Sequence, residues 1–179
     1  MMMVDPKDKE MAFVVIDLQK RFMTDQDDME EGFNKPIALT NRIADMFRDA
    51  GRPVIFVKMI GGTDCRPYDG DDGEDFFDGV KVCPSDIVMP KHYMNSFRDT
   101  RLAEIIKENG CDCALFAGTV TQYCVISTYY SAFDYDIVPY LAEGACIAAG
   151  KEKNDAAYTI AKTMVPSEIG AYLNAHRRK

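Results

Sequence analysis

The sequence has no long apolar run and little positive charge. None of its apolar segments approaches the ~20 residues that a membrane-spanning helix needs, and its first ten residues lack the apolar core of a signal peptide. It has 21 lysines and arginines against 29 aspartates and glutamates, a formal net charge of −8. That sign argues against nucleic acid or an anionic membrane as a partner. We expect a cytoplasmic protein.

The length and the cysteine content indicate one ordinary domain. The chain has 179 residues, of which 47% are hydrophobic, so a single domain over residues 1–179 can bury a core without disulfides. In the cytoplasm the six cysteines default to free thiols. Cys111 and Cys113 are too closely spaced for a usual zinc pair, and no second pair accompanies them.

Short apolar runs alternate with helical patterns along the chain. Runs typical of strands buried on both faces occupy residues 11–16, 54–57, 86–90, 114–117, 136–139 and 163–165. Helical periodicity covers residues 36–50, 100–109, 124–133, 154–161 and 167–176. This alternation predicts an α/β fold with an open, mostly parallel sheet of about six strands, covered on both faces.

One irregular stretch, residues 60–84, interrupts this order. It holds an acidic run from Asp69 to Asp75 that does not match the calcium-loop pattern. A loop of this length is either a functional lid or a mobile, solvated connection.

Three polar residues stand where predicted strands end. Asp17 follows the first strand, Lys91 follows the third, and Cys124 opens the helix after the fourth. Ligands bind outside the carboxyl ends of the strands in open parallel sheets, so we expect the three side chains to converge if the first strand is central. Taken singly, the Asp could be a turn residue, the Lys a surface charge and the Cys a small core residue.

Cys124 is the candidate nucleophile. The unpaired N–H groups and the dipole of a helix N-terminus favour a thiolate and can hold an oxyanion. A neighbouring carboxylate can take the thiol proton and later return it, and an ammonium stabilises both anions.

Three segments resemble the signature segments of the isochorismatase-like cysteine hydrolases, which include the nicotinamidases. They are Asp17-Leu-Gln19 with Phe22, Lys91 with Asn95-Ser96-Phe97, and Gly118-Thr-Val-Thr-Gln-Tyr-Cys124-Val125. The resemblance implies a three-layer α/β/α sandwich, Rossmann-like, and an Asp17–Lys91–Cys124 triad. It also implies a cis peptide at Thr119–Val120 and an oxyanion hole formed by the N–H groups of Val120 and Cys124.

The chain departs from the nicotinamidases at their metal site, which uses an Asp and two His residues. It has no histidine between Met59 and Pro90, and its two histidines are His92, expected at the rim or in a structural role, and His176. We therefore expect no metal, no cofactor and a substrate other than nicotinamide. Arg21 occupies a place where many relatives carry an acid.

The predicted function is hydrolysis of a small amide at its C–N bond through a thioester. Phe22, Tyr93, Phe97 and Tyr123 are candidate pocket walls, although each could equally be a core or subunit contact. A homo-oligomer, dimer or tetramer, is expected. The alternatives are a nicotinamidase with a divergent metal site and a non-catalytic small-molecule binder of the same fold.

Overall fold

A computed structural model describes residues 6–22, 29–61 and 75–178. Six strands form one sheet in which every pairing is parallel, in the order β3-β2-β1-β4-β5-β6. The strands are β1 (Met11–Ile16), β2 (Val54–Met59), β3 (Ile87–Lys91), β4 (Cys113–Thr119), β5 (Val138–Ile147) and β6 (Thr163–Met164). The predicted α/β sandwich is confirmed, and β1 is central, as the convergence of Asp17, Lys91 and Cys124 required.

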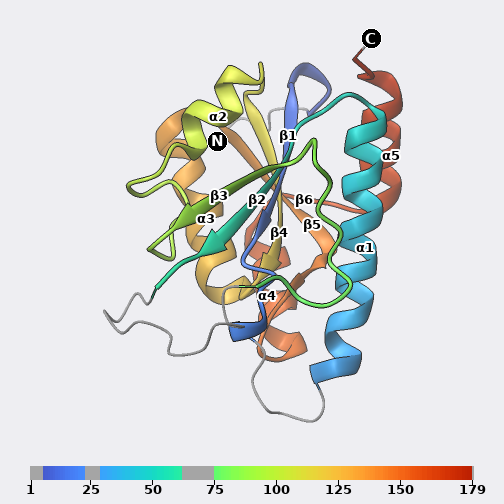
Figure 1. Cartoon of the computed structure of the whole chain (residues 1–179). Helices are drawn as coiled ribbons and strands as arrows, with labels where there is room; N and C mark the ends of the chain where they lie inside the picture. The colour runs from blue at the N-terminus through green and yellow to red at the C-terminus, as the bar shows by residue number, and fades with distance from the viewer. Residues whose placement is uncertain (1–5, 23–28, 62–74, 179) are drawn as a thin grey trace.

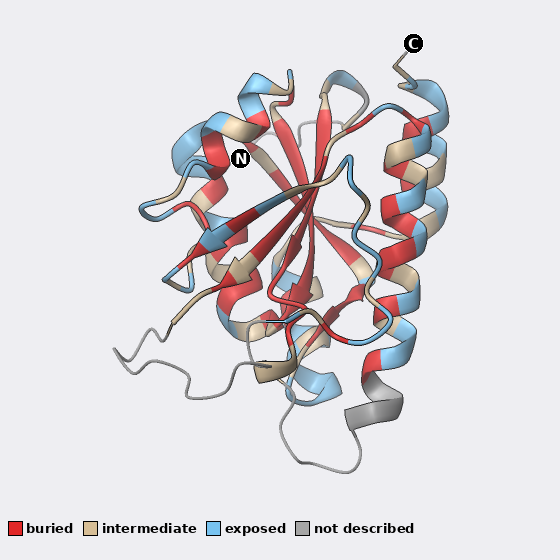
Figure 2. Cartoon of the chain, viewed as in Figure 1, coloured by how far each residue is buried: buried red, intermediate tan, exposed pale blue. Residues whose placement is uncertain are grey.

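Helices cover both faces of this sheet (Figure 1). Helices α1 (Met29–Asp49) and α5 (Pro166–Ala175) pack on one face, and α2 (Leu102–Glu108), α3 (Ile126–Ser131) and α4 (Lys151–Ile160) pack on the other. Strand β1 is buried throughout, and its alternate residues enter two different core clusters. Both faces of β1 therefore need apolar side chains, which explains the continuous apolar run. Figure 2 shows buried strands and helix faces that are buried toward the sheet and exposed outside.

Two elements, α1 and β5, extend furthest beyond their predicted bounds. The prediction began the first long helix at Pro36, where the apolar stripe begins, whereas α1 begins at Met29 and contains Pro36 in its interior. Phe33 and Ile37, on either side of this proline, are buried in the core, and that packing carries the helix through it. Strand β5 runs on to Ile147, past Gly144, through a register shift against β4.

The described helices include none that is both long and apolar enough to cross a membrane. The five cysteines among the described residues are free thiols, as expected. Cys65 and the acidic residues from Asp69 to Glu74 lie outside the described residues, so the two interpretations of that loop stay open.

Candidate active site

Asp17 leaves β1 in a left-handed backbone conformation, with a φ of 52°. Its N–H donates to the carbonyl of Val57 at 3.0 Å, and its own carbonyl accepts from the Gln19 N–H at 2.7 Å. Aspartate tolerates this conformation better than most residues do. The turn places the Asp17 side chain, which has no exposed surface, at the carboxyl edge of the sheet.

Gln19 joins the ends of two strands. Its side-chain amide donates to the Met59 carbonyl at 3.0 Å and accepts from the Met59 N–H at 2.6 Å. Met59 is paired in register with Lys91 across β2 and β3. The two bonds to Gln19 therefore align the ends of β1, β2 and β3 and bring Lys91 toward Asp17.

Lys91 and Asp17 form a fully buried ion pair. Lys91 Nζ lies 2.7 Å from Asp17 Oδ2, and neither side chain is exposed. The ammonium also donates to the Met94 carbonyl at 3.0 Å. Lone buried charges are strongly unfavourable, so each member of this pair depends on the other.

Strand β4 brings Cys124 to the same place through a tight approach at Gly118. Gly118 has a φ of 121°, and a side chain there would collide with the Ile16 carbonyl. The Thr119–Val120 peptide that follows is cis, which confirms that prediction. A π-helical turn, Thr121–Val125, then leads into α3. The prediction that Cys124 opens the helix is wrong, because it is the fourth residue of this turn.

The π-type hydrogen bonds of this turn begin one residue after Cys124. The first bond of the π type runs from the Val125 N–H to the Val120 carbonyl at 3.4 Å, one residue after Cys124. A wider helical ring moves the last unpaired N–H one residue further along than in an α-helix. The turn is tied to α4 and β5, since Thr121 Oγ1 donates to Asn154 Oδ1 at 2.6 Å and Asn154 Nδ2 donates to the Cys146 carbonyl at 3.2 Å.

Burial dominates the electrostatics of the three groups. Burial raises the pKa of Asp17, while the charge of Lys91, hydrogen bonds from Lys91 and Cys124, and the charge of Arg21 oppose that rise. Burial and the Asp17 charge raise the pKa of Cys124 to about 12, against the opposing effect of Lys91. Burial and the Asp17 charge therefore act against the thiolate that a helix N-terminus is expected to favour. Desolvation outweighs the helix terminus here.

The four aromatic candidates for pocket walls occupy different surroundings. Phe97 is only 2% exposed, stacks on Tyr135 at 4.9 Å and meets Phe116 edge-on, which is the core position that the sequence left open. Tyr93 lies under the Arg98 guanidinium at 3.8 Å. Phe22 is half-buried beside Arg21, and Tyr123 is 54% exposed. Phe22, Tyr93 and Tyr123 remain candidates for contact with a ligand.

Sequence reasoning assigned no role to the polar residues that support this cluster. Gln19, Thr121, Thr128 and Ser96 are all buried and hydrogen-bonded around it. Thr121 and Thr128 stand among the apolar residues of the segment that leads into and forms α3. A polar side chain on a buried helix needs a hydrogen-bond partner. The polar residues in this apolar segment were therefore the sequence feature that could have indicated a supporting role.

The described residues do not assemble a nicotinamidase-type metal site. Among residues 6–22, 29–61 and 75–178, no three His, Cys, Asp or Glu side chains are grouped as metal ligands would be. His92 is exposed, with Nδ1 2.9 Å from the Ile60 carbonyl, and its expected rim or structural role stays a prediction. The expectation that the reaction needs no metal stays a prediction.

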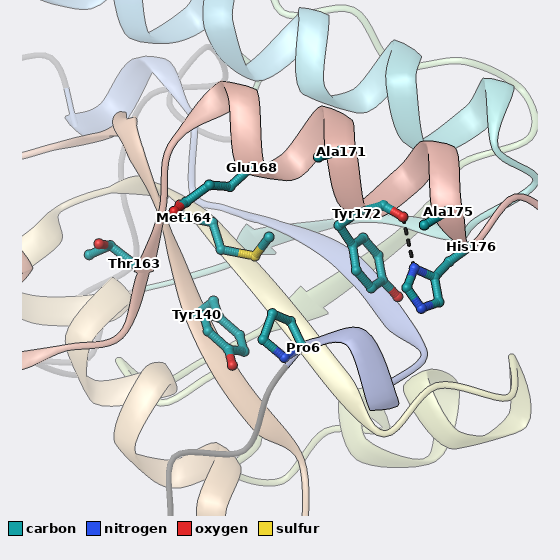
Figure 3. Close-up of a pocket in the computed structure, with 9 residues that line it drawn as sticks. All are labelled: Pro6, Tyr140, Thr163, Met164, Glu168, Ala171, Tyr172, Ala175 and His176. Atoms are coloured by element: carbon teal, nitrogen blue, oxygen red, sulfur yellow. Dashed lines mark hydrogen bonds between the residues drawn. The ribbon is translucent and has the colours of Figure 1, made fainter.

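An apolar cavity of about 580 Å³ lies elsewhere, between β5, β6 and α5 (Figure 3). Tyr140, Met164, Tyr172 and His176 are among its walls. The Tyr172 hydroxyl accepts from the N–H of Met11, the first residue of β1, so the cavity opens near the amino ends of the strands. The Asp17 cluster lies at the carboxyl ends of the strands, so the cavity is separate from it.

Comparisons with known proteins agree with this geometry. An uncharacterized isochorismatase family protein of Bacillus subtilis, YddQ, is 27% identical over 146 residues, covering 75% of this chain and 76% of that protein. The ureidoacrylate amidohydrolase RutB of Pantoea ananatis is 32% identical over 83 residues, 46% of this chain and 33% of that protein. The crystal structure of N-carbamoylsarcosine amidase from Thermoplasma acidophilum superimposes with a TM-score of 0.73 at 24% identity, covering 87% and 95% of the two chains.

The family model of the isochorismatase domain matches residues 11–169, which include Asp17, Lys91 and Cys124. The chain belongs to the isochorismatase family, as its three sequence motifs predicted.

Proposed function

We propose that the protein hydrolyses the C–N bond of a small amide, with Cys124 as nucleophile and Asp17 and Lys91 as its partners. The observation that supports this most is the buried cluster itself: the Asp17 carboxylate is paired with the Lys91 ammonium at 2.7 Å, and Asp17 and Cys124 each shift the pKa of the other. A purely structural core gains little from three buried ionisable groups. Such a cluster at the carboxyl edge of a parallel sheet is typical of an active site.

Asp17 is suited to accept the thiol proton. Its pKa is raised by burial, which makes the carboxylate a stronger base than an exposed one. Cys124 Sγ attacks the amide carbonyl as its proton moves to Asp17. Collapse of the tetrahedral intermediate breaks the C–N bond, and the proton passes from Asp17 to the leaving nitrogen. Lys91 keeps Asp17 ionised before attack, because its charge opposes the burial effect.

The N–H groups of Val120 and Cys124 are the proposed oxyanion donors. Val120 directly precedes the π-helical turn that contains Cys124, which supports the assignment of these two N–H groups as a pair. Donors of this kind stabilise the charge that develops on the carbonyl oxygen. Water then attacks the thioester while Asp17 takes a proton from it, and the carbon–sulfur bond breaks to return the thiol.

The substrate class is proposed from the relatives and from local charge. Two of the three similar proteins with a named activity act, by their names, on acids that carry a carbamoyl group, and the third is a pyrazinamidase. In this chain the charge of Arg21 lowers the pKa of Asp17, so this guanidinium is a candidate contact for an acidic group of the substrate. We therefore choose N-carbamoyl acids as first substrates, followed by simple amides and nicotinamide.

The test is ammonia release by the purified protein and by two cysteine variants. We expect Cys124→Ala to abolish turnover. Cys113→Ala is the matched control, because Cys113 is equally buried but stands at the opposite end of β4. Intact-mass analysis of the wild type during turnover should show the acyl adduct. Mass analysis of a digest should locate that adduct on the peptide that carries Cys124. Near-normal turnover by the Cys124→Ala variant would exclude the cysteine mechanism.

The same panel separates the alternatives. Release of ammonia from nicotinamide alone would favour the divergent nicotinamidase. Binding without turnover by the wild type would favour a non-catalytic member of the fold. The expected homo-oligomer is a separate proposal, and light scattering of the purified protein tests it.

A further inference from the structure

The side chain of Thr128, on α3, is completely buried one helical turn beyond Cys124. Its Oγ1 lies 2.7 Å from the Cys124 carbonyl, 3.0 Å from the Ser96 N–H and 2.9 Å from Ser96 Oγ. A carbonyl can only accept, so the hydroxyl proton of Thr128 goes to the Cys124 carbonyl, which is nearer than the Met94 carbonyl at 3.5 Å. Both Ser96 groups must then donate to Thr128, and the donor and both lone pairs of this hydroxyl are used.

Ser96 belongs to the loop that also holds Lys91 in place. Lys91 Nζ donates to the carbonyl of Met94, two residues before Ser96, at 3.0 Å. The Ser96 carbonyl in turn accepts from Thr100 Oγ1 at 2.6 Å, which closes the loop on itself. One hydroxyl thus connects the turn that carries Cys124 to the loop that orients the ammonium of Lys91.

A hydroxyl that bonds the carbonyl four residues earlier is common in helices and by itself means little. The two bonds from Ser96 are different, because they join two segments that each carry a member of the proposed triad. We propose that Thr128 is a positioning residue that keeps Lys91 in register with Asp17 and Cys124. This inference rests on the proposed function for its kinetic test, and a second measurement below does not need a substrate.

Loss of the Thr128 hydroxyl has a specific electrostatic consequence. The groups that act on Asp17 are Lys91, Cys124 and Arg21, and Lys91 lowers the pKa of that carboxyl most strongly. If Lys91 shifts with its loop, the pKa of Asp17 rises, and the acid limb of the kcat/KM profile moves to higher pH. A change in stability alone would not move that limb.

The experiment compares three variants. Thr128→Val keeps the shape and removes the hydroxyl, and Thr128→Ser restores the hydroxyl. Thr40→Val is the control, because Thr40 is equally buried on α1, across the sheet, and its Oγ1 has no hydrogen-bond partner among the described residues. We expect Thr128→Val to lower kcat/KM by roughly ten- to a hundredfold and to shift the acid limb upward. The other two variants should stay close to the wild type in both respects.

The second measurement is the rate at which iodoacetamide alkylates Cys124 at fixed pH, followed by mass spectrometry. Lys91 lowers the pKa of Cys124, so its displacement should slow alkylation in Thr128→Val but not in Thr128→Ser. The partly exposed Cys83 is the internal reference in each sample.

The outcomes separate the two proposals. An active wild type whose acid limb is unmoved in Thr128→Val overturns the positioning role and leaves the function standing. A wild type that hydrolyses none of the substrates removes the proposed function. The alkylation rates then decide the positioning role: slower Cys124 alkylation in Thr128→Val alone supports it, and equal rates in all variants overturn it.

Discussion

Replacing Lys91 by methionine should destabilise the protein strongly, because it leaves the Asp17 carboxylate buried without its cation. The two side chains have no exposed surface, and Nζ and Oδ2 are 2.7 Å apart. Removing one partner of a buried pair costs about 3–5 kcal/mol of unfolding free energy. That is a large share of the roughly 5–15 kcal/mol of a typical domain.

The assay is urea unfolding at pH 7 of the wild type, Lys91→Met, Asp17→Asn and the double variant. Methionine fills much of the lysine volume, so the loss reports the charge more than a cavity. In the double variant neither charge remains, and we expect most of the lost stability to return. A loss below about 1 kcal/mol for Lys91→Met, or losses that simply add in the double variant, would refute this account of the site.

The pH dependence of the unfolding free energy provides a second test of the same ion pair. The folded-state pKa of Asp17 is raised, and removing Lys91 raises it further. A carboxyl with a raised folded pKa binds more protons in the folded state than in the unfolded state, so its stability contribution is present below the unfolded pKa and is lost as pH rises through the folded pKa. The deficit of Lys91→Met should therefore shrink as the pH falls toward the ordinary aspartate pKa, as measured by urea midpoints between pH 4 and 8.

Three further predictions follow from other contacts. Gly118→Ala should lower the melting temperature far more than Gly61→Ala. Both glycines have positive φ, but only at Gly118 would a Cβ collide with the Ile16 carbonyl. An equal loss in melting temperature for the two variants would contradict this close approach of Gly118 to Ile16. Arg48→Ala should lower the free energy of unfolding in urea by about 3 kcal/mol, because it leaves the buried Asp86 carboxylate, 1% exposed and bonded to Arg48 at 2.6 Å, without its cation. The value of kcat/KM should not change, because this pair lies far from the site. Ammonia release should survive dialysis against EDTA, since backbone N–H groups are the proposed oxyanion donors; activity lost on chelation and restored by one metal per subunit would contradict this.

The local pattern of the chain determined the fold class and the places where chemistry could occur. The first strand, residues 11–16, has the predicted bounds, because a continuous apolar run that ends at an aspartate identifies a strand buried on both faces and its carboxyl end. The same logic located Cys124 beyond β4 and Lys91 at the end of β3, although Lys91 is the last residue of that strand and does not follow it, and the family resemblance of the motif around Gly118 implied the cis bond. These are properties of short segments, which need no knowledge of what packs against them.

Tertiary structure decided what depends on neighbours distant in sequence. Core packing continues α1 through Pro36, and pairing with β4 extends β5 past Gly144. The pKa of Cys124 is raised by burial and by the Asp17 charge, and both come from residues that no motif describes. Likewise the bonds of Gln19 to Met59 and of Thr128 to Ser96 join segments about 40 and 32 residues apart. Burial and side-chain hydrogen bonds depend on the folded chain. The residues of the candidate site could therefore be named from the sequence, but their pKa shifts and the hydrogen bonds that position them could not.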